Sequence, residues 1–307
     1  MVDRLGFNFL HRAVCRLISP CGEKRTAVIE KRLRDISNLL LELQQKHSVL
    51  ITILNEMGSM LIGYSGGVDS TFLLKSAHDL LGDNVLAVTA DSATLTGDEL
   101  DEAGEVASAI GAAHLAVKTD EFESEDFIAN PPERCYYCKK ERFSALKDIQ
   151  AARGFKWVAE GSNADDDNDW RPGTKAVREL GVRSPLKEAG LTKPDIRELS
   201  RALGLSTWDK PSAACLASRI PYGERITEDK LNQIAEAEQY LKELGFRQLR
   251  VRHHGDLAKI EVPADDMQEV IRRADEITTR IKQLGFYFVA LDLAGFKSGS
   301  MNKVLNK

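Results

Sequence analysis

Long hydrophobic runs are missing from this sequence of 307 residues, and their absence excludes an integral membrane protein built from helices. No apolar stretch approaches the roughly 20 residues that a helix needs to span a bilayer. The N-terminal segment carries charges throughout its apolar part, so it makes a poor signal peptide. We therefore expect a cytoplasmic protein without membrane partners.

An excess of basic residues is also missing. The 42 Lys and Arg residues are outnumbered by 47 Asp and Glu residues, which gives a net charge of −5. A chain built mainly to hold a nucleic-acid backbone would have the opposite balance. We therefore expect no nucleic-acid partner, although a local basic patch is compatible with these totals.

Cysteine is too scarce for a disulfide framework, because only five residues are present in a chain of this size. In a cytoplasmic protein, such residues more often have metal-binding or catalytic roles. Cys15 and Cys21 have no partner at ligand spacing, and we interpret them as incidental. Cys135, Cys138 and Cys215 remain as candidates for chemistry.

The stretch from Met60 to Lys75 combines an apolar segment, a glycine turn and an apolar-rich helix start. Met60–Tyr64 predicts a buried strand, and Ser65–Gly67 allows the backbone to approach a ligand closely. A strand, a glycine turn and a helix N-terminus place several N–H groups around one concavity, which favours an anion such as phosphate. Asp69 suits this place if Mg²⁺ bridges its carboxylate and a phosphate, or if it orients the turn. An ordinary glycine-rich turn is the alternative.

Strands and helices alternate after this turn, which predicts an α/β fold with a doubly wound parallel sheet. The expected strands are Asn84–Ala90, Ala113–Lys118 and Trp157–Gly161, and the expected helices are 26–57, Asp98–Ile110 and Glu141–Arg153. Ligands of such sheets lie beyond the carboxyl ends of the strands. That rule gathers the candidate nucleotide-binding residues around one crevice: Ser65, Gly66, Gly67, Asp69, Ser70, Ala90, Ser92 and Gly161.

The pattern changes after about Trp208 and predicts a small second domain. Its expected elements are the helix Glu228–Leu244, the strands Gln248–His253 and Ala258–Val262, the helix Asp265–Leu284 and the strand Tyr287–Leu293. We therefore predict an extension over residues 1–24, the α/β domain over 25–207, and an α+β domain for substrate binding or oligomerisation over 208–307.

The three remaining cysteines have alternative interpretations. Cys135 and Cys138 form a Cys-x-x-Cys pair at a turn before a basic helix, a spacing used for redox couples, zinc and iron–sulfur clusters. Two buried structural cysteines are the alternative. Cys215 lies close to Arg219 in the sequence, and a nearby cation favours a reactive thiolate or a metal ligand. The alternative is that Cys215 is a small residue of the core. Together, three thiolates could hold a cluster with one open metal corner.

Two charged segments also have two interpretations each. The acidic loop Asp165–Asp169 follows the last strand of the α/β domain and indicates either a Mg²⁺ site or a solvated turn. Arg250 and Arg252 alternate along one strand and share a face, and arginine suits recognition of phosphate or carboxylate. A solvated strand face is the alternative.

Several motifs together resemble a known family. The sequence Ser-Gly-Gly-Val-Asp-Ser at Ser65–Ser70 resembles the PP-loop of ATP pyrophosphatases, which cleave ATP to AMP and pyrophosphate. From about Thr26 to its C-terminus, the chain resembles the LarE family of ATP-dependent sulfur transferases. The more specific motifs behind this resemblance are Glu160–Asp166, Asp169–Gly173, Cys215, Arg219–Gly223, Arg250–His253 and Asp292–Gly299.

The resemblance implies a PP-loop ATP pyrophosphatase fold, a homo-hexamer and a pyridinium mononucleotide substrate that carries two carboxylates. ATP and Mg²⁺ would adenylate each carboxylate, with Asp69 in a catalytic role. Sulfur would then displace AMP and leave a thiocarboxylate, for synthesis of a nickel-pincer cofactor. The residues implied in substrate binding are Arg219, Arg250, Arg252, Glu261 and Asp292.

Two sulfur sources are known in that family. In one, a cysteine at the position of Cys215 gives up its own sulfur and becomes dehydroalanine. In the other, three cysteines bind a 4Fe–4S cluster whose open iron carries an extra sulfide. Because this chain has Cys135 and Cys138, the resemblance implies the cluster type with Cys135, Cys138 and Cys215 as ligands.

Two competing interpretations come from other classes of protein. One is a PP-loop enzyme that thiolates tRNA, and the other is a redox sensor that binds ATP or a cluster. The acidic charge and the lack of zinc-ribbon cysteine pairs disfavour tRNA as a partner. Pyrophosphate release with the pyridinium substrate, but not with tRNA, separates all three interpretations.

Overall fold

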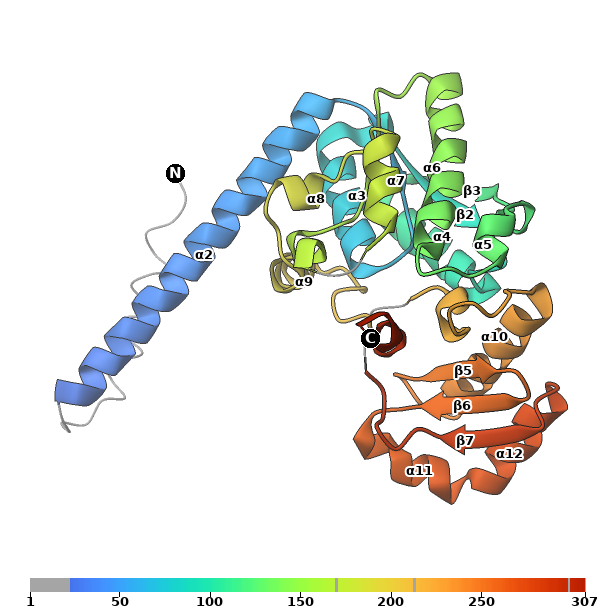
Figure 1. Cartoon of the computed structure of the whole chain (residues 1–307). Coiled ribbons are helices and arrows are strands. Elements are labelled where there is room, and N and C mark those ends of the chain that lie inside the picture. The colour runs from blue at the N-terminus through green and yellow to red at the C-terminus, as the bar shows by residue number, and fades with distance from the viewer. Residues whose placement is uncertain (1–22, 169–170, 212–213, 298, 307) are drawn as a thin grey trace. The chain divides into compact units, whose positions relative to one another are not determined.

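The computed structural model describes residues 23–168, 171–211, 214–297 and 299–306 (Figure 1). The chain divides into two compact units, Met1–Ser48 and Val49–Lys307. Cys15 and Cys21 lie outside the described residues. Helix α2 (Glu23–Met57) confirms the helix predicted over 26–57. Within the second unit, Leu50 and Leu54 of this helix are fully buried, so its last turns belong to the core.

A four-stranded parallel sheet forms the centre of the second unit and confirms the predicted fold class. Its strands are β1 (Met60–Gly63), β2 (Val85–Asp91), β3 (Ala113–Lys118) and β4 (Trp157–Glu160). Their order is β3-β2-β1-β4, so the chain leaves β1 in one direction and later returns to its other side. Such a reversal point is where ligands bind in open α/β sheets, beyond the carboxyl ends of the strands.

Helices cover the sheet because the strands are apolar on both faces. The helices are α3 (Val68–Leu81), α4 (Gly97–Ile110), α5 (Glu125–Ile128), α6 (Arg134–Arg153), α7 (Gly173–Glu179), α8 (Pro185–Glu188) and α9 (Lys193–Ala202). In register across the sheet, Leu61 pairs with Leu86 and Val158, and all three pack with Phe143 and Leu146 of α6. Helix α3 contacts α4 and α9, whereas α6 contacts α7.

The start of α6 corrects one prediction. The helix begins at Arg134 instead of near Glu141, so Cys135 and Cys138 lie in its first turns and not in a turn before it. The physical reason is that no glycine or proline interrupts the chain after Pro132, and proline is tolerated just ahead of a helix.

The C-terminal part is a small α+β region with a mixed sheet. Its elements are α10 (Glu228–Glu243), β5 (Arg250–His254), β6 (Leu257–Glu261), α11 (Met267–Arg272), α12 (Ala274–Gln283) and β7 (Phe288–Leu291). Strand β6 is central, antiparallel to β5 and parallel to β7. The single helix expected over Asp265–Leu284 is wrong, because Arg273 leaves helical geometry (φ −99°, ψ 18°) and separates α11 from α12.

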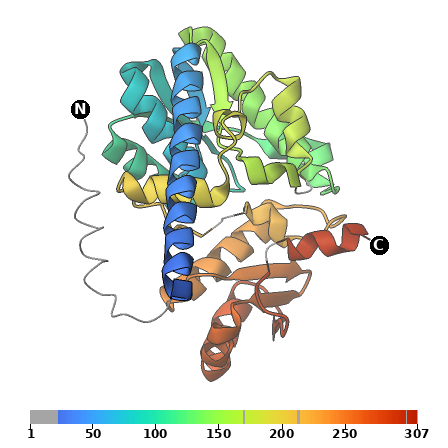
Figure 2. The ribbon, with the colours of Figure 1, turned by 90° about the vertical axis from the view of Figure 1, so that its left-hand side faces the viewer.

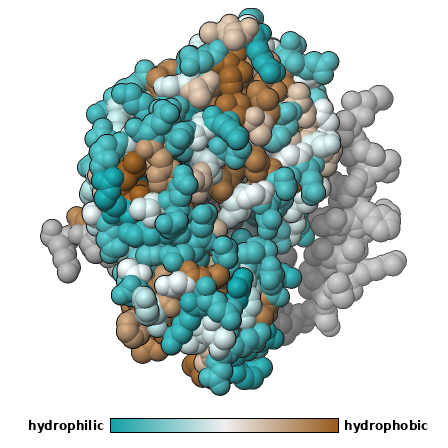
Figure 3. All heavy atoms as spheres, turned by 90° about the vertical axis from the view of Figure 1, so that its right-hand side faces the viewer, coloured by the Kyte–Doolittle hydropathy of each residue, from teal (hydrophilic) through white to brown (hydrophobic). Residues whose placement is uncertain are grey.

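The C-terminal sheet and its helices lie beside the parallel-sheet region in both ribbon views (Figures 1 and 2). A buried cluster joins the two regions and includes Phe127 of α5, Leu216, and Leu231 and Ile234 of α10. Figure 3 shows a mainly hydrophilic face on which hydrophobic residues form several separate groups. Over the described part of the chain, none of the helices has the length and apolar character of a membrane span.

Candidate functional site

The glycine turn opens into a cavity of about 380 Å³, which we call the loop cavity. Six of the residues predicted to bind a nucleotide line it: Ser65, Gly67, Asp69, Ser70, Ala90 and Gly161. The other two contact residues of its wall. The carbonyl oxygen of Gly66 accepts a hydrogen bond from Lys210, and the hydroxyl of Ser92 accepts one from Arg142. The structure therefore brings the predicted crevice residues together.

Two glycines are required by the close packing at this turn. Gly66 has a positive φ of 64°, and a Cβ added there would lie 3.1 Å from both Cα and Cβ of Ala103. At the end of β4, a Cβ on Gly161 would lie 3.0 Å from the backbone nitrogen of Ser70. The carboxyl ends of β1 and β4 can therefore both reach the N-terminus of α3, where the helix dipole favours an anion.

Asp69 lies in the first turn of α3, and only one of its two carboxylate oxygens accepts hydrogen bonds. Its Oδ2 accepts hydrogen bonds from Lys193 Nζ at 2.8 Å and from Asn163 Nδ2 at 3.4 Å. Its Oδ1 is buried and has no hydrogen-bond partner among the described residues. Burial raises the pKa of Asp69, and the charge of Lys193 opposes that rise. A buried, orphaned carboxylate oxygen beside an anion-binding turn fits a Mg²⁺ ligand.

The acidic loop after β4 is held by specific contacts. Asp166 is buried, accepts a hydrogen bond from the backbone of Asn163 at 3.1 Å and forms an ion pair with Arg171 at 2.9 Å. Asp165 accepts a hydrogen bond from the backbone nitrogen of Lys193 at 2.7 Å. These carboxylates therefore orient the loop and the start of α9. Asp169 lies outside the described residues, and a Mg²⁺ site in this loop stays a prediction.

The three candidate thiols gather beside the loop cavity. Cys215 lines that cavity and precedes the short 3₁₀ helix Leu216–Arg219. Cys138 and Cys215 pack against the same buried cluster. Cys135 is exposed as a residue, but crowding by its neighbours desolvates the thiol and raises its pKa, and negative charge on Cys215 raises it further. Burial also raises the pKa of Cys138, to about 12, so a cationic group would be needed to hold these sulfurs as thiolates.

Cations of α6 lie next to the thiols. Arg142 Nε donates to Glu121 at 2.5 Å, and Cys138 Sγ lies 3.8 Å from the same carboxylate oxygen. Lys139 forms an ion pair with Glu160 at 2.8 Å. Helical spacing explains this grouping, because residues three and four apart share a face. Only the basic character of the helix signalled these residues in the sequence.

The described side chains do not form a site for a single metal ion. Over the described ranges, no group of three or more His, Cys, Asp or Glu side chains is arranged to hold a metal ion. The ligands of a polynuclear cluster surround several metal atoms and its sulfides, so they stand farther apart than the ligands of one ion. Negative charge on Cys215 raises the pKa of both Cys135 and Cys138, and the cations beside the thiols would offset thiolate charge. Cysteine is the ligand type that such a cluster uses, and a cluster held by these three thiols stays a prediction.

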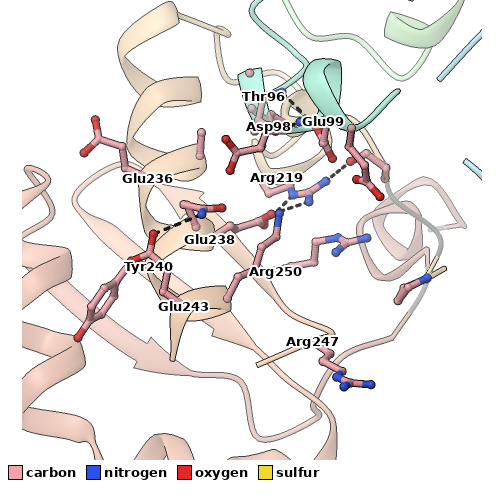
Figure 4. A pocket seen from close by; sticks show the side chains of 18 of the residues that line it. Thr96, Asp98, Glu99, Arg219, Glu236, Glu238, Tyr240, Glu243, Arg247 and Arg250 are labelled. Carbon is pink, nitrogen blue, oxygen red and sulfur yellow. Dashed lines mark hydrogen bonds and ion pairs between the residues drawn. The ribbon is translucent and has the colours of Figure 1, made fainter. Parts of the chain in front are cut away.

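A second cavity of about 430 Å³ lies between α4, α10 and β5, and we call it the arginine cavity. Figure 4 shows Arg219 and Arg250 beside each other in it, with Asp98 and Glu99 of α4 just above Arg219. Arg219 is buried and donates to Glu238 at 2.8 Å and 2.7 Å. Burial, together with the charge of Arg219, lowers the pKa of Arg250 to about 10. A bound anion would relieve that crowding of positive charge.

The other three residues predicted to bind substrate form a supporting network. Arg252 is buried and pairs with Glu261 at 2.7 Å, and Lys259 links Glu261 at 3.2 Å to Asp292 at 2.8 Å. None of Arg252, Glu261 and Asp292 is among the described residues that line the loop cavity or the arginine cavity. Arg252 also donates to the backbone oxygen of Ser218 at 3.0 Å, next to Arg219. Their direct contact with substrate stays a prediction.

The sequence did not reveal the partners of the predicted residues. Glu238 lies in α10, a helix that the sequence predicted without marking this residue, and Lys193 begins α9, a helix that the sequence analysis did not predict. Lys210 follows α9 and lines both cavities, as do Glu99, Pro211 and Ala214. The two cavities are therefore neighbours that share a wall.

Similarity to known proteins agrees with this geometry. No family model matches the chain. The chain is 44% identical over 267 residues to an uncharacterised protein of Synechocystis sp., covering 86% of this chain and 100% of that protein. It is 42% identical over 267 residues to the pyridinium-3,5-bisthiocarboxylic acid mononucleotide synthase of Lactiplantibacillus plantarum, covering 86% and 96%. A weaker similarity, 25% over 158 residues, joins 48% of the chain to 52% of a glutamine-hydrolysing GMP synthase component from Archaeoglobus fulgidus.

Proposed function

Because the chain belongs to the LarE family of pyridinium-3,5-bisthiocarboxylic acid mononucleotide synthases, we propose that it converts the two carboxylates of a pyridinium mononucleotide into thiocarboxylates. ATP supplies the activation and leaves as AMP and pyrophosphate. One observation supports this most: Cys215 lines the same cavity as Ser65 and Gly67 of the glycine turn. Activation and sulfur transfer at one carbon require both groups within reach of it.

The first step makes the carboxylate reactive. A carboxylate oxygen attacks the α-phosphorus of ATP, the bond from that phosphorus to the bridging oxygen breaks, and pyrophosphate leaves. In this proposal, the N–H groups at the start of α3 and the ammonium of Lys193 stabilise the negative charge that develops on pyrophosphate. Asp69 is the residue that would hold Mg²⁺, because its Oδ1 is buried without a partner, and that ion would neutralise further charge.

The substrate is held from the arginine cavity. Arg250 binds its phosphate or its second carboxylate, since arginine matches both anions with paired N–H donors, and Arg219 adds positive charge beside it. Glu238 accepts two hydrogen bonds from Arg219 and fixes the direction of that guanidinium. The lowered pKa of Arg250 supports this assignment, because an anion there would be stabilised by more than one cation.

The second step delivers sulfur to the adenylated carbon, from which AMP departs. In this proposal, Cys135, Cys138 and Cys215 would hold a 4Fe–4S cluster, which when bound would supply sulfur at the sulfide level. Lys139 and Arg142 balance the charge of the three thiolates. A sacrificial role for Cys215 alone is the second candidate, but it gives Cys135 and Cys138 no task.

Pyrophosphate release tests the proposal. The anaerobically reconstituted protein is incubated with ATP and Mg²⁺ in three parallel reactions. One contains the pyridinium biscarboxylate mononucleotide, one contains tRNA and one contains neither. We expect release only with the mononucleotide. Release that depends on tRNA would assign the chain to thiolation of RNA, and no release with any acceptor would favour a sensor.

A further inference from the structure

The two cavities share one cation among the described residues, and that cation has no role in the steps above. Lys210 lines both the loop cavity and the arginine cavity. We propose that Lys210 is a catalytic residue whose ammonium contacts the α-phosphate of ATP and the reacting carboxylate at the same time. This inference rests on the proposed function, because it concerns the adenylation step.

The position of the ammonium supports this role. Lys210 Nζ donates to the backbone oxygen of Gly66 at 3.2 Å, so it lies at the edge of the glycine turn. It also forms an ion pair with Glu102 of α4 at 2.7 Å. Glu102 is 47% exposed, so water can replace this partner when a ligand arrives. An ammonium has three N–H donors, and they rotate about one flexible stem.

Adenylation needs a cation at this junction for a simple electrostatic reason. The attacking carboxylate and the α-phosphate are both anions, and they must come into contact for the new bond to form. A cation between them lowers that repulsion and stabilises the charge that spreads over the α-phosphate oxygens in the transition state. Such a group has to reach both binding sites, and a residue in their shared wall meets this requirement.

Among the described residues, each of the other cations lines only one of the two cavities. Lys193 pairs with Asp69 and lines the loop cavity without being among the residues that line the arginine cavity. Arg219 and Arg250 line the arginine cavity without being among those that line the loop cavity. Lys210 also belongs to the segment that leads into Cys215. Its contact with the adenylate would therefore position the activated carbon and the thiol relative to each other.

The alternative is that Lys210 only fastens the glycine turn to α4. Three variants separate the two roles: Lys210→Met removes the charge and retains a long side chain, Lys210→Arg restores the charge, and Glu102→Gln removes the ion pair but leaves the cation. Each variant is assayed for pyrophosphate release at saturating ATP and mononucleotide, for the Kd of Mg–ATP and for its thermal midpoint.

The catalytic role predicts that Lys210→Met lowers kcat about 10²–10³-fold, the usual loss when one donor to a transition-state oxyanion is removed. Its Kd for Mg–ATP and its thermal midpoint should stay near those of the natural chain. Lys210→Arg should recover at least about tenfold of the lost kcat, and Glu102→Gln should stay within about threefold of the natural kcat.

The proposal is overturned if Lys210→Met keeps its kcat, or if Glu102→Gln loses as much activity as Lys210→Met. It is also overturned if weaker binding of Mg–ATP accounts for the whole loss. A natural chain that releases no pyrophosphate with the mononucleotide would instead refute the proposed function, and the role of Lys210 with it. If the natural chain and Lys210→Met are equally active, only the role of Lys210 is refuted and the proposed function stands.

Discussion

Replacement of Glu238 with glutamine should destabilise the fold by a measurable amount. Glu238 is 4% exposed and accepts hydrogen bonds from Arg219 at 2.8 Å and 2.7 Å and from the backbone nitrogen of Val251 at 2.9 Å. Glutamine keeps one acceptor oxygen but removes the charge opposite the guanidinium of Arg219, whose side chain is 4% exposed. Breaking a buried ion pair by removing one partner costs about 3–5 kcal/mol, and the retained acceptor places Glu238→Gln near the lower value.

The matched control is an ion pair at the surface. Glu188 pairs with Arg183, and both side chains are 32% exposed. Glu188→Gln should cost less than about 1 kcal/mol, because water screens the pair and replaces its hydrogen bonds. Both free energies of unfolding can be measured by equilibrium denaturation in urea. The reasoning is refuted if Glu238→Gln costs no more than Glu188→Gln. The KM for the mononucleotide should also rise in Glu238→Gln, because Arg219 loses its anchor.

Three further predictions concern the cluster, the nucleotide and acid stability. Anaerobic preparations should be brown, and Cys135→Ser, Cys138→Ser or Cys215→Ser should each bleach the visible absorption. An unchanged spectrum in one of these variants would show that its cysteine is not a cluster ligand. Asp69→Asn should abolish pyrophosphate release and leave the visible spectrum intact; release at the natural rate would show that its carboxylate is dispensable. Burial lowers the pKa of His253 from 6.5 to about 4, so the stability it contributes is present above pH 6.5 and is lost as the pH falls toward 4. Its limiting slope is about 1.4 kcal/mol per pH unit, and His253→Gln should flatten the stability profile in that window, measured by denaturation at each pH.

The features that could be predicted from the sequence are those with a local cause. The turn Ser65–Gly67 requires a strand before it and a helix after it, so its position at the edge of a parallel sheet followed directly. The alternation of apolar segments predicted the sheet, and the β–α order placed Ala90 and Gly161 at the same edge. The site residues on this edge were therefore accessible without a structure.

The remaining features depend on which side chains meet across the fold. Lys193 reaches Asp69, and Lys210 reaches Gly66, from segments more than a hundred positions away in the sequence. No periodicity specifies such partners. Arg252 illustrates the same limit, because its spacing did not reveal that the fold buries it against Glu261.

Product analysis with intact-protein mass spectrometry tests the central claim most directly. The reconstituted protein is incubated with ATP, Mg²⁺ and the mononucleotide, and the masses of the small-molecule product and of the polypeptide are measured. We predict a product in which carboxylate oxygen has been replaced by sulfur, made by a chain whose own mass does not change. A chain that loses the elements of H₂S at Cys215 for each sulfur delivered would contradict the cluster, and an unaltered mononucleotide would contradict the whole reaction.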